Sequence, residues 1–97
     1  MNEEELEIQF QKALEKASEM TQASLPQDVQ LRLYAYYKQA TIGNLEPKQS
    51  STYHLRDAFK TNAWMQISHI SVSEAKKNYI EIINSLYENN SNNEEEN

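Results

Sequence analysis

Residues 34–43 read Tyr-Ala-Tyr-Tyr-Lys-Gln-Ala-Thr-Ile-Gly, and this stretch says more about the fold than any other part of the 97-residue chain. It contains no proline, and Gly43, the single glycine of the chain, is typical of the residue that ends a helix. Tyr34, Tyr37 and Lys38 stand at i, i+3 and i+4, so a helix places them on one face. Two phenol rings beside an ammonium group suit a ligand that is both aromatic and anionic.

The sequence on either side of this stretch also favours helices. There are only two prolines, and Glu, Gln, Lys, Ala and Leu are abundant, while no internal repeat or sustained heptad is present. Apolar residues at steps of three and four predict helices over about 3–21, 27–42 and 56–67. Ser71 and Glu74 have capping-box spacing and should open a fourth helix that ends near Tyr87. The sequence therefore predicts one all-α domain.

The net charge of −6 is unevenly distributed. Residues 1–7 and residues 88–97 each hold four acids and no base, whereas residues 8–87 hold nine Lys and Arg against seven acids and sum to +2. Acidic ends argue against general nucleic-acid binding, which needs a dominant basic face. The middle of the chain can still hold a local basic site.

The two ends are expected to lie at or beyond the edge of the folded domain. After Tyr87 the chain contains no apolar residue, so burial cannot offset the entropy of ordering it, and residues 88–97 are expected to be a disordered tail. The domain is expected over residues 1–87, with residues 1–5 frayed. The start is neither basic nor apolar, no stretch is long enough to span a membrane, and there is no cysteine. These features favour an intracellular soluble protein, and a cytoplasmic monomer is expected.

The residues offer little for catalysis. His54 and His69 have no neighbour at metal-ligand spacing, and one glycine cannot make a phosphate-binding loop. No enzyme activity, metal site or cofactor is therefore expected.

The Tyr34, Tyr37 and Lys38 face has two interpretations from the residues alone. Tyrosines at helical spacing are more often core or boundary residues than ligand contacts. Arg56 and Lys60, one turn apart on the third predicted helix, favour a binding site because they add two cations on one face. Tyr79 is open in the same way: it is either a boundary residue with its hydroxyl at the surface or a ligand contact.

Over residues 8–87 the chain resembles the acyl-CoA-binding protein family. Residues 33–44 closely resemble the family's Tyr-x-x-Tyr-Lys-Gln-Ala-Thr-x-Gly motif. Residues 60–64, Lys-Thr-Asn-Ala-Trp, are similar to the family's Lys-Trp-x-Ala-Trp, and residues 73–80 are similar to its Glu-x-Ala-x-x-x-Tyr-Ile.

The resemblance implies a four-helix up-down-down-up bundle that binds long-chain acyl-CoA thioesters and carries or buffers them in the cytosol. It implies that Tyr34, Lys38 and Lys60 hold the nucleotide 3′-phosphate and that Tyr37 lies against the adenine. Tyr79 would contact the ligand, and Arg56 falls where the family often has another cation.

Four positions, in three parts of the chain, depart from the family pattern. The first Trp of the Lys-Trp motif is Thr61 here, with Phe59 as a partial replacement. A Lys common on the first helix aligns with Ser18, and the family's Pro-Gly between the second and third helices aligns with Ser50-Ser51.

Acyl-CoA-using enzymes are the partners that the resemblance implies. The alternative function is a helical protein-interaction module that has lost its ligand, and nucleic-acid binding by the Tyr-Lys face is a weaker third.

Overall fold

The computed structural model of the chain describes residues 2–43 and 55–96, with the side chains of residues 22, 55–57 and 89–96 left aside. Its elements are α1 (Glu3–Glu19), a 3₁₀ turn η1 (Gln22–Ser24), α2 (Gln27–Thr41), α3 (Leu55–Ile67) and α4 (Val72–Glu96). No strand occurs in these described ranges, so the all-α prediction is confirmed. The predicted loop between α2 and α3, with Ser50, Ser51 and His54, lies outside the described residues.

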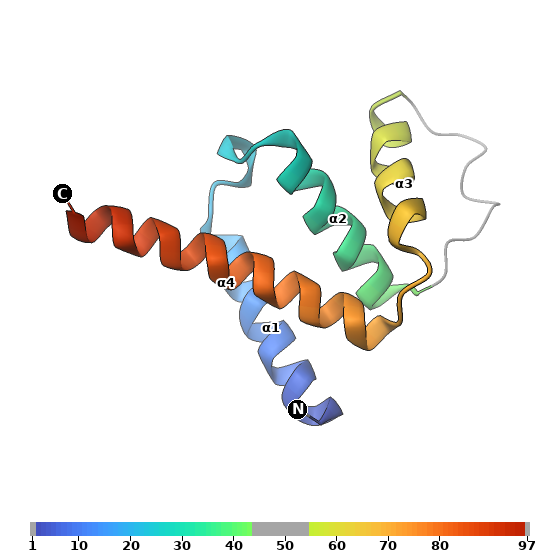
Figure 1. Cartoon of the computed structure of the whole chain (residues 1–97), viewed down its shortest axis with the longest axis horizontal. Coiled ribbons are helices and arrows are strands. Elements are labelled where there is room, and N and C mark those ends of the chain that lie inside the picture. The colour runs from blue at the N-terminus through green and yellow to red at the C-terminus, as the bar shows by residue number, and fades with distance from the viewer. Residues whose placement is uncertain (1, 44–54, 97) are drawn as a thin grey trace.

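The helices form a bundle in which α1 packs on α4, α4 packs on α2, and α2 packs on α3 (Figure 1). The α2 and α3 helices run side by side in the same direction, and α4 crosses α1. The buried apolar side chains come mainly from α1, α2 and α4. This core comprises Leu6, Phe10, Ala13, Ala17, Leu33, Ala40, Ala75, Tyr79, Ile80 and Ile83.

Two helix boundaries follow directly from local sequence. The Oγ of Ser71 accepts a hydrogen bond from the Glu74 backbone N–H at 3.0 Å, which confirms the predicted start of α4. Gly43 has a φ of 90°, a left-handed conformation that glycine adopts without a Cβ penalty, and its N–H donates to the Lys38 carbonyl. The tyrosine-rich stretch therefore ends where the sequence predicts.

The first turn of α1 differs from the prediction that residues 1–5 fray. Residues Glu3, Glu4 and Glu5 are helical, and Asn2 caps them by accepting a hydrogen bond from the Glu5 N–H at 2.8 Å. Three acids in the first turn also complement the positive end of the helix dipole. An Asn before a run of acids is the signal that should have indicated an ordered start.

The far end of α4 also differs. The helix continues to Glu96, nine residues beyond its predicted end at Tyr87, so the backbone of residues 88–96 is helical rather than disordered. Extending an existing helix avoids the cost of nucleation, and the residues after Tyr87 include no Gly or Pro to stop it. In Figure 1 these last turns project beyond the other helices. That they lie outside the folded domain remains a prediction.

A buried glutamine ties α2 to α3 and to the turn before α4. Gln39 is 2% exposed, and its Oε1 accepts a hydrogen bond from the indole Nε1 of Trp64 at 2.9 Å. Its Nε2 donates to the carbonyls of Ser68, at 3.2 Å, and Ile70, at 2.7 Å. Because each of these groups is paired, the amide can be buried without the usual desolvation penalty. The Gln39 network thus fixes α3 beside the tyrosines of α2.

Candidate functional site

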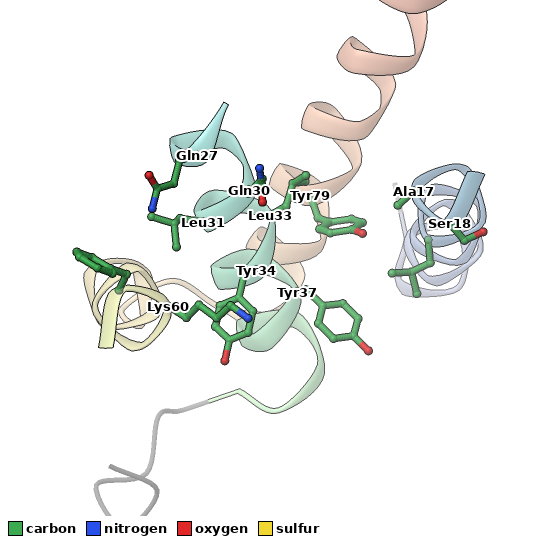
Figure 2. Close-up of a pocket in the computed structure, with 12 residues that line it drawn as sticks. Ala17, Ser18, Gln27, Gln30, Leu31, Leu33, Tyr34, Tyr37, Lys60 and Tyr79 are labelled. Atoms are coloured by element: carbon green, nitrogen blue, oxygen red, sulfur yellow. The ribbon is translucent and has the colours of Figure 1, made fainter. Parts of the chain in front are cut away.

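A groove of about 660 Å³ lies between the helices and contains most of the predicted site residues (Figure 2). The α2 helix supplies one wall, and α1, α3 and α4 supply the others. The lining consists of Leu14, Ala17 and Ser18 from α1, Gln27, Gln30, Leu31, Leu33, Tyr34 and Tyr37 from α2, Phe59 and Lys60 from α3, and Tyr79 from α4. Tyr34 and Tyr37, one turn apart on α2, therefore meet Lys60 and Tyr79, which are distant in the sequence, in one groove.

One end of the groove is cationic. The Nζ of Lys60 lies 5.2 Å from the centre of the Tyr34 ring, and the Nζ of Lys38 lies 5.7 Å from the same centre. Figure 2 shows Lys60 extending from α3 toward the Tyr34 ring. Both ammonium groups are within cation–π range, but they repel each other. An anion placed between them would relieve that repulsion. This arrangement favours binding of a doubly charged anion beside the Tyr34 ring.

An aromatic row continues from the groove into the core. The Tyr37 ring lies 6.3 Å from the Tyr79 ring, at 49°, and the Tyr79 ring packs edge-on against Phe10 at 5.4 Å. Tyr37 is 41% exposed, whereas Tyr79 is 5% exposed. A planar aromatic ligand can therefore stack at Tyr37 while Tyr79 supports that ring from behind.

The sequence left open whether Tyr79 is a boundary residue or a ligand contact, and the structure shows where its ring lies. It is not a boundary residue, because it belongs to the buried core cluster and also lines the groove. Burial raises the pKa of the Tyr79 phenol above its ordinary value of 10.0, and the neighbouring Tyr37 phenol adds to that effect. Tyr79 is therefore placed where a ligand in the groove could reach it.

Arg56 is only partly placed by the structure. It lies in the first turn of α3, four residues before Lys60, so the predicted spacing on one helix is confirmed. Its side chain is outside the described residues. Lys38 is not in the groove lining, and it joins the site through its contact with the Tyr34 ring.

Sequence reasoning missed part of the groove lining. The Tyr34 face continues toward the start of α2 at steps of three and four, through Leu31, Gln30 and Gln27. On α3, Phe59 stands next to Lys60. The same spacing rule that identified Tyr37 and Lys38 could have found them if applied in the other direction. Ser18, noted only as a lost cation, does line the groove on the α1 side.

A metal site and a membrane-spanning helix were also sought in the part of the chain that the structure describes. Residues 2–43 and 55–96 contain no group of three or more His, Cys, Asp or Glu side chains that could hold a metal ion. Among the helices of these residues, none combines the length and the apolar character needed to cross a bilayer.

Comparisons with known proteins point to one family. The model of the family described as "Acyl CoA binding protein" matches residues 7–83. The acyl-CoA-binding protein of Saccharomyces cerevisiae is 36% identical over 59 residues, which cover 61% of this chain and 68% of that protein. The acyl-CoA-binding protein of Gossypium hirsutum is 31% identical over 83 residues, covering 86% of this chain and 92% of the relative.

A solved structure agrees at the level of the fold. The crystal structure of Oryza sativa acyl-CoA-binding protein 2 superposes with a TM-score of 0.79 at 31% identity. The superposition covers 89% of this chain and 94% of the rice chain.

Proposed function

This chain belongs to the acyl-CoA-binding protein family, and we propose that it binds long-chain acyl-CoA thioesters and acts as an intracellular carrier or buffer for them. The observation that carries the proposal is the convergence of Lys38 and Lys60 on the Tyr34 ring at one end of a partly apolar groove. A ligand with a phosphate at one end and a hydrocarbon chain at the other fits that polarity.

The cationic end would hold the 3′-phosphate of the nucleotide. A phosphate monoester carries about −1.5 to −2 charges near neutral pH. The ammonium groups of Lys38 and Lys60 would donate charge-assisted hydrogen bonds to its oxygens, and the Tyr34 hydroxyl would donate a third. The two cations come from different helices, so phosphate binding would also fasten α3 to α2. We also propose Arg56, one turn before Lys60 on α3, as a further cation for the phosphate.

The aromatic row would hold the base. Adenine would stack on the exposed face of Tyr37, and Tyr79 would keep that ring in place from the core side. The acyl chain would lie against the apolar lining, where each buried methylene is worth about 0.8 kcal/mol before ordering costs. The nucleotide end would fix the orientation, and the chain would provide much of the affinity.

The proposed role is binding without chemistry. The described residues that line the groove include no His, Asp or Glu, so among them only phenol and ammonium groups could act as a general acid or base. We further propose that the protein works as a cytoplasmic monomer and that its partners are enzymes that use acyl-CoA.

Titration calorimetry with palmitoyl-CoA, coenzyme A and palmitate tests the proposal. Palmitoyl-CoA should bind tightest, coenzyme A more weakly, and palmitate weakest, because the polar groups of the site match a nucleotide rather than a carboxylate. Equal affinity for palmitate and palmitoyl-CoA would contradict the assignment. No binding of any of the three would favour the alternative, a helical protein-interaction module that has lost its ligand.

A further inference from the structure

A cleft of about 290 Å³ lies between α2 and α4. Its lining consists of Val29 and Arg32 from α2 and of Glu81, Ile82, Ser85 and Leu86 from α4. The three apolar members, Val29, Ile82 and Leu86, pack against the core but are only partly buried. Two neighbouring helices with accessible apolar side chains between them form the kind of surface that accepts a third, amphipathic helix.

The α2–α4 cleft lies on another side of α2 from the groove of the candidate site. Arg32 stands two positions after Gln30 and two positions before Tyr34, and two positions correspond to about 200° of rotation around a helix. The described residues that line the cleft are all different from those that line the groove. A partner bound in the cleft would therefore leave the groove open to its ligand.

The charge on the α4 side of the cleft is negative. After Lys77 the helix contains no Lys or Arg, and it carries the acids Glu81, Glu88, Glu94, Glu95 and Glu96. Glu81 and Glu88 are exposed and stand seven positions apart, so they share one face of α4. On the α2 side, the charge of Arg32 is offset by an exposed ion pair with Asp28 at 3.4 Å. The apolar lining is therefore bordered by unbalanced negative charge.

The last turns of α4 lengthen this acidic surface. They project beyond the other helices (Figure 1), and the helix from Glu81 to Glu96 is about 22 Å long. A partner helix of about 15 residues has the same length. Such a helix could begin in the cleft and continue beside the acidic end of α4.

The charge distribution distinguishes between the possible occupants of the cleft. A second copy of the chain would bring the same acids to the interface, and like charges that face each other oppose association. A lipid surface with anionic headgroups would be repelled for the same reason. A helix with apolar side chains on one face and Lys or Arg beside them complements both the apolar lining and the acids.

We propose that the α2–α4 cleft is a docking site for a basic amphipathic helix of a partner protein. The apolar face of that helix contacts Val29, Ile82 and Leu86, and its cations pair with Glu81 and Glu88. The acidic end of α4 speeds the encounter by attracting the basic helix. The inference goes beyond the proposed function and does not depend on it, because the cleft is separate from the groove.

The first test uses the wild-type protein with and without palmitoyl-CoA. The probe is an amphipathic peptide of about 18 residues built from Leu and Lys at helical spacing. It should shift the methyl NMR signals of Val29, Ile82 and Leu86 in both forms of the protein, and its affinity should fall as salt is added. A peptide in which Glu replaces every Lys should not bind.

Four results of this titration would overturn the inference. They are no binding of the Leu-Lys peptide, equal binding of the Leu-Glu peptide, shifts confined to other faces such as that of Ile42 and Val72, and displacement of the peptide by palmitoyl-CoA. Concentration-dependent broadening of the Ile82 and Leu86 signals without peptide would also overturn it, because the occupant would then be a second copy. Binding of the peptide by a protein that binds no acyl-CoA would contradict the proposed function and leave this inference intact.

The second test reverses one charge at the cleft. Glu81→Lys should weaken binding of the Leu-Lys peptide roughly tenfold at low salt and leave palmitoyl-CoA affinity unchanged. The matched control is Glu15→Lys, the same change at an exposed acid of α1 outside the cleft lining, which should weaken the peptide by about twofold at most. Equal losses in the two variants would show that the peptide responds to net charge rather than to the cleft, and would overturn the inference.

Discussion

Tyr34 is the residue on which the site depends, because its ring holds one ammonium group from its own helix and one from α3. If these cations bind the 3′-phosphate, removing either should weaken binding of the complete nucleotide specifically. Lys38→Ala and Lys60→Ala should each cost about 1–3 kcal/mol in palmitoyl-CoA affinity, below the range for a fully buried charge pair. Calorimetry with palmitoyl-CoA and its 3′-dephospho analogue provides the measurement.

The deficit of both variants should shrink with the dephospho ligand. The control is Lys77→Ala on α4, an exposed lysine outside the groove lining, which should bind both ligands like the wild type. An equal deficit with both ligands would show that Lys38 and Lys60 do not contact the 3′-phosphate.

Gln39 belongs to the same sequence motif but has a structural role. Gln39→Leu would remove the acceptor of the buried Trp64 N–H and the donor to the partly buried carbonyls of Ser68 and Ile70. We expect a loss of about 2–4 kcal/mol in the free energy of unfolding, measured by urea denaturation, since each unpaired buried group costs about 1–3 kcal/mol.

A double-mutant cycle with Trp64→Phe would isolate the indole bond. Trp64→Phe removes the donor, so Gln39→Leu in that background should cost less than it does alone. Strict additivity of the two losses would contradict a direct Trp64–Gln39 coupling.

Sequence reasoning could not predict the structural role of Gln39, because a Gln in an amphipathic pattern looks like a surface residue. Its partners lie 25 to 31 positions away and meet it only in the folded bundle.

At the scale of elements, α1 is attached to α4 by polar contacts at the edge of the core. Lys76 donates to the Glu7 carboxylate at 2.6 Å, and Lys16 donates to Asn84 at 3.0 Å. The hydrogen bond from Lys76, with a smaller one from Gln11, lowers the pKa of Glu7 below its ordinary value of 4.5. The stabilisation from Glu7 is therefore fully present above pH 4.5 and is lost as the pH falls through the lower folded-state value.

Glu7→Gln should therefore destabilise the protein at neutral pH and have little effect at a pH below the folded-state pKa. Denaturant unfolding of the wild type and variant across this range provides the measurement. Glu15→Gln, which removes an exposed acid from the same helix, is the control and should change the stability at neutral pH less than Glu7→Gln does. A destabilisation by Glu7→Gln that persists unchanged in acid would show that charge is not its cause.

The element boundaries show what apolar periodicity can and cannot predict. The four helices lie where the stripes predict them, and α1, α2 and α3 differ from prediction by at most two residues at each end. The end of α4 was missed because a stripe marks only the buried part of a helix, and a helix can continue after its burial ends. The charged and aromatic face of α2 could be identified from the sequence, whereas the bonds of Gln39 to Trp64, Ser68 and Ile70 depend on the packing of α2 against α3 and have no linear pattern.

For the molecule as a whole, the question is whether residues 88–97 belong to the binding domain. The last core-packed residue of α4 is Leu86, and the family match ends at residue 83. The four acids of this segment would slightly repel an anionic ligand, an effect that is screened over about 8 Å at physiological ionic strength. We propose that the segment is a helical extension outside the domain, with no role in holding acyl-CoA.

Deleting residues 88–97 should therefore separate helix content from stability. The far-UV circular dichroism signal should fall, because residues 88–96 are helical. The melting temperature should stay nearly unchanged, because the deleted segment contains no apolar residue to bury. Palmitoyl-CoA should bind with the same affinity, and slightly faster at low salt because the four acids are gone. A drop of many degrees in melting temperature, or loss of binding, would instead place these turns inside the folded domain and give the acidic helix end a role in supporting α1 and the groove.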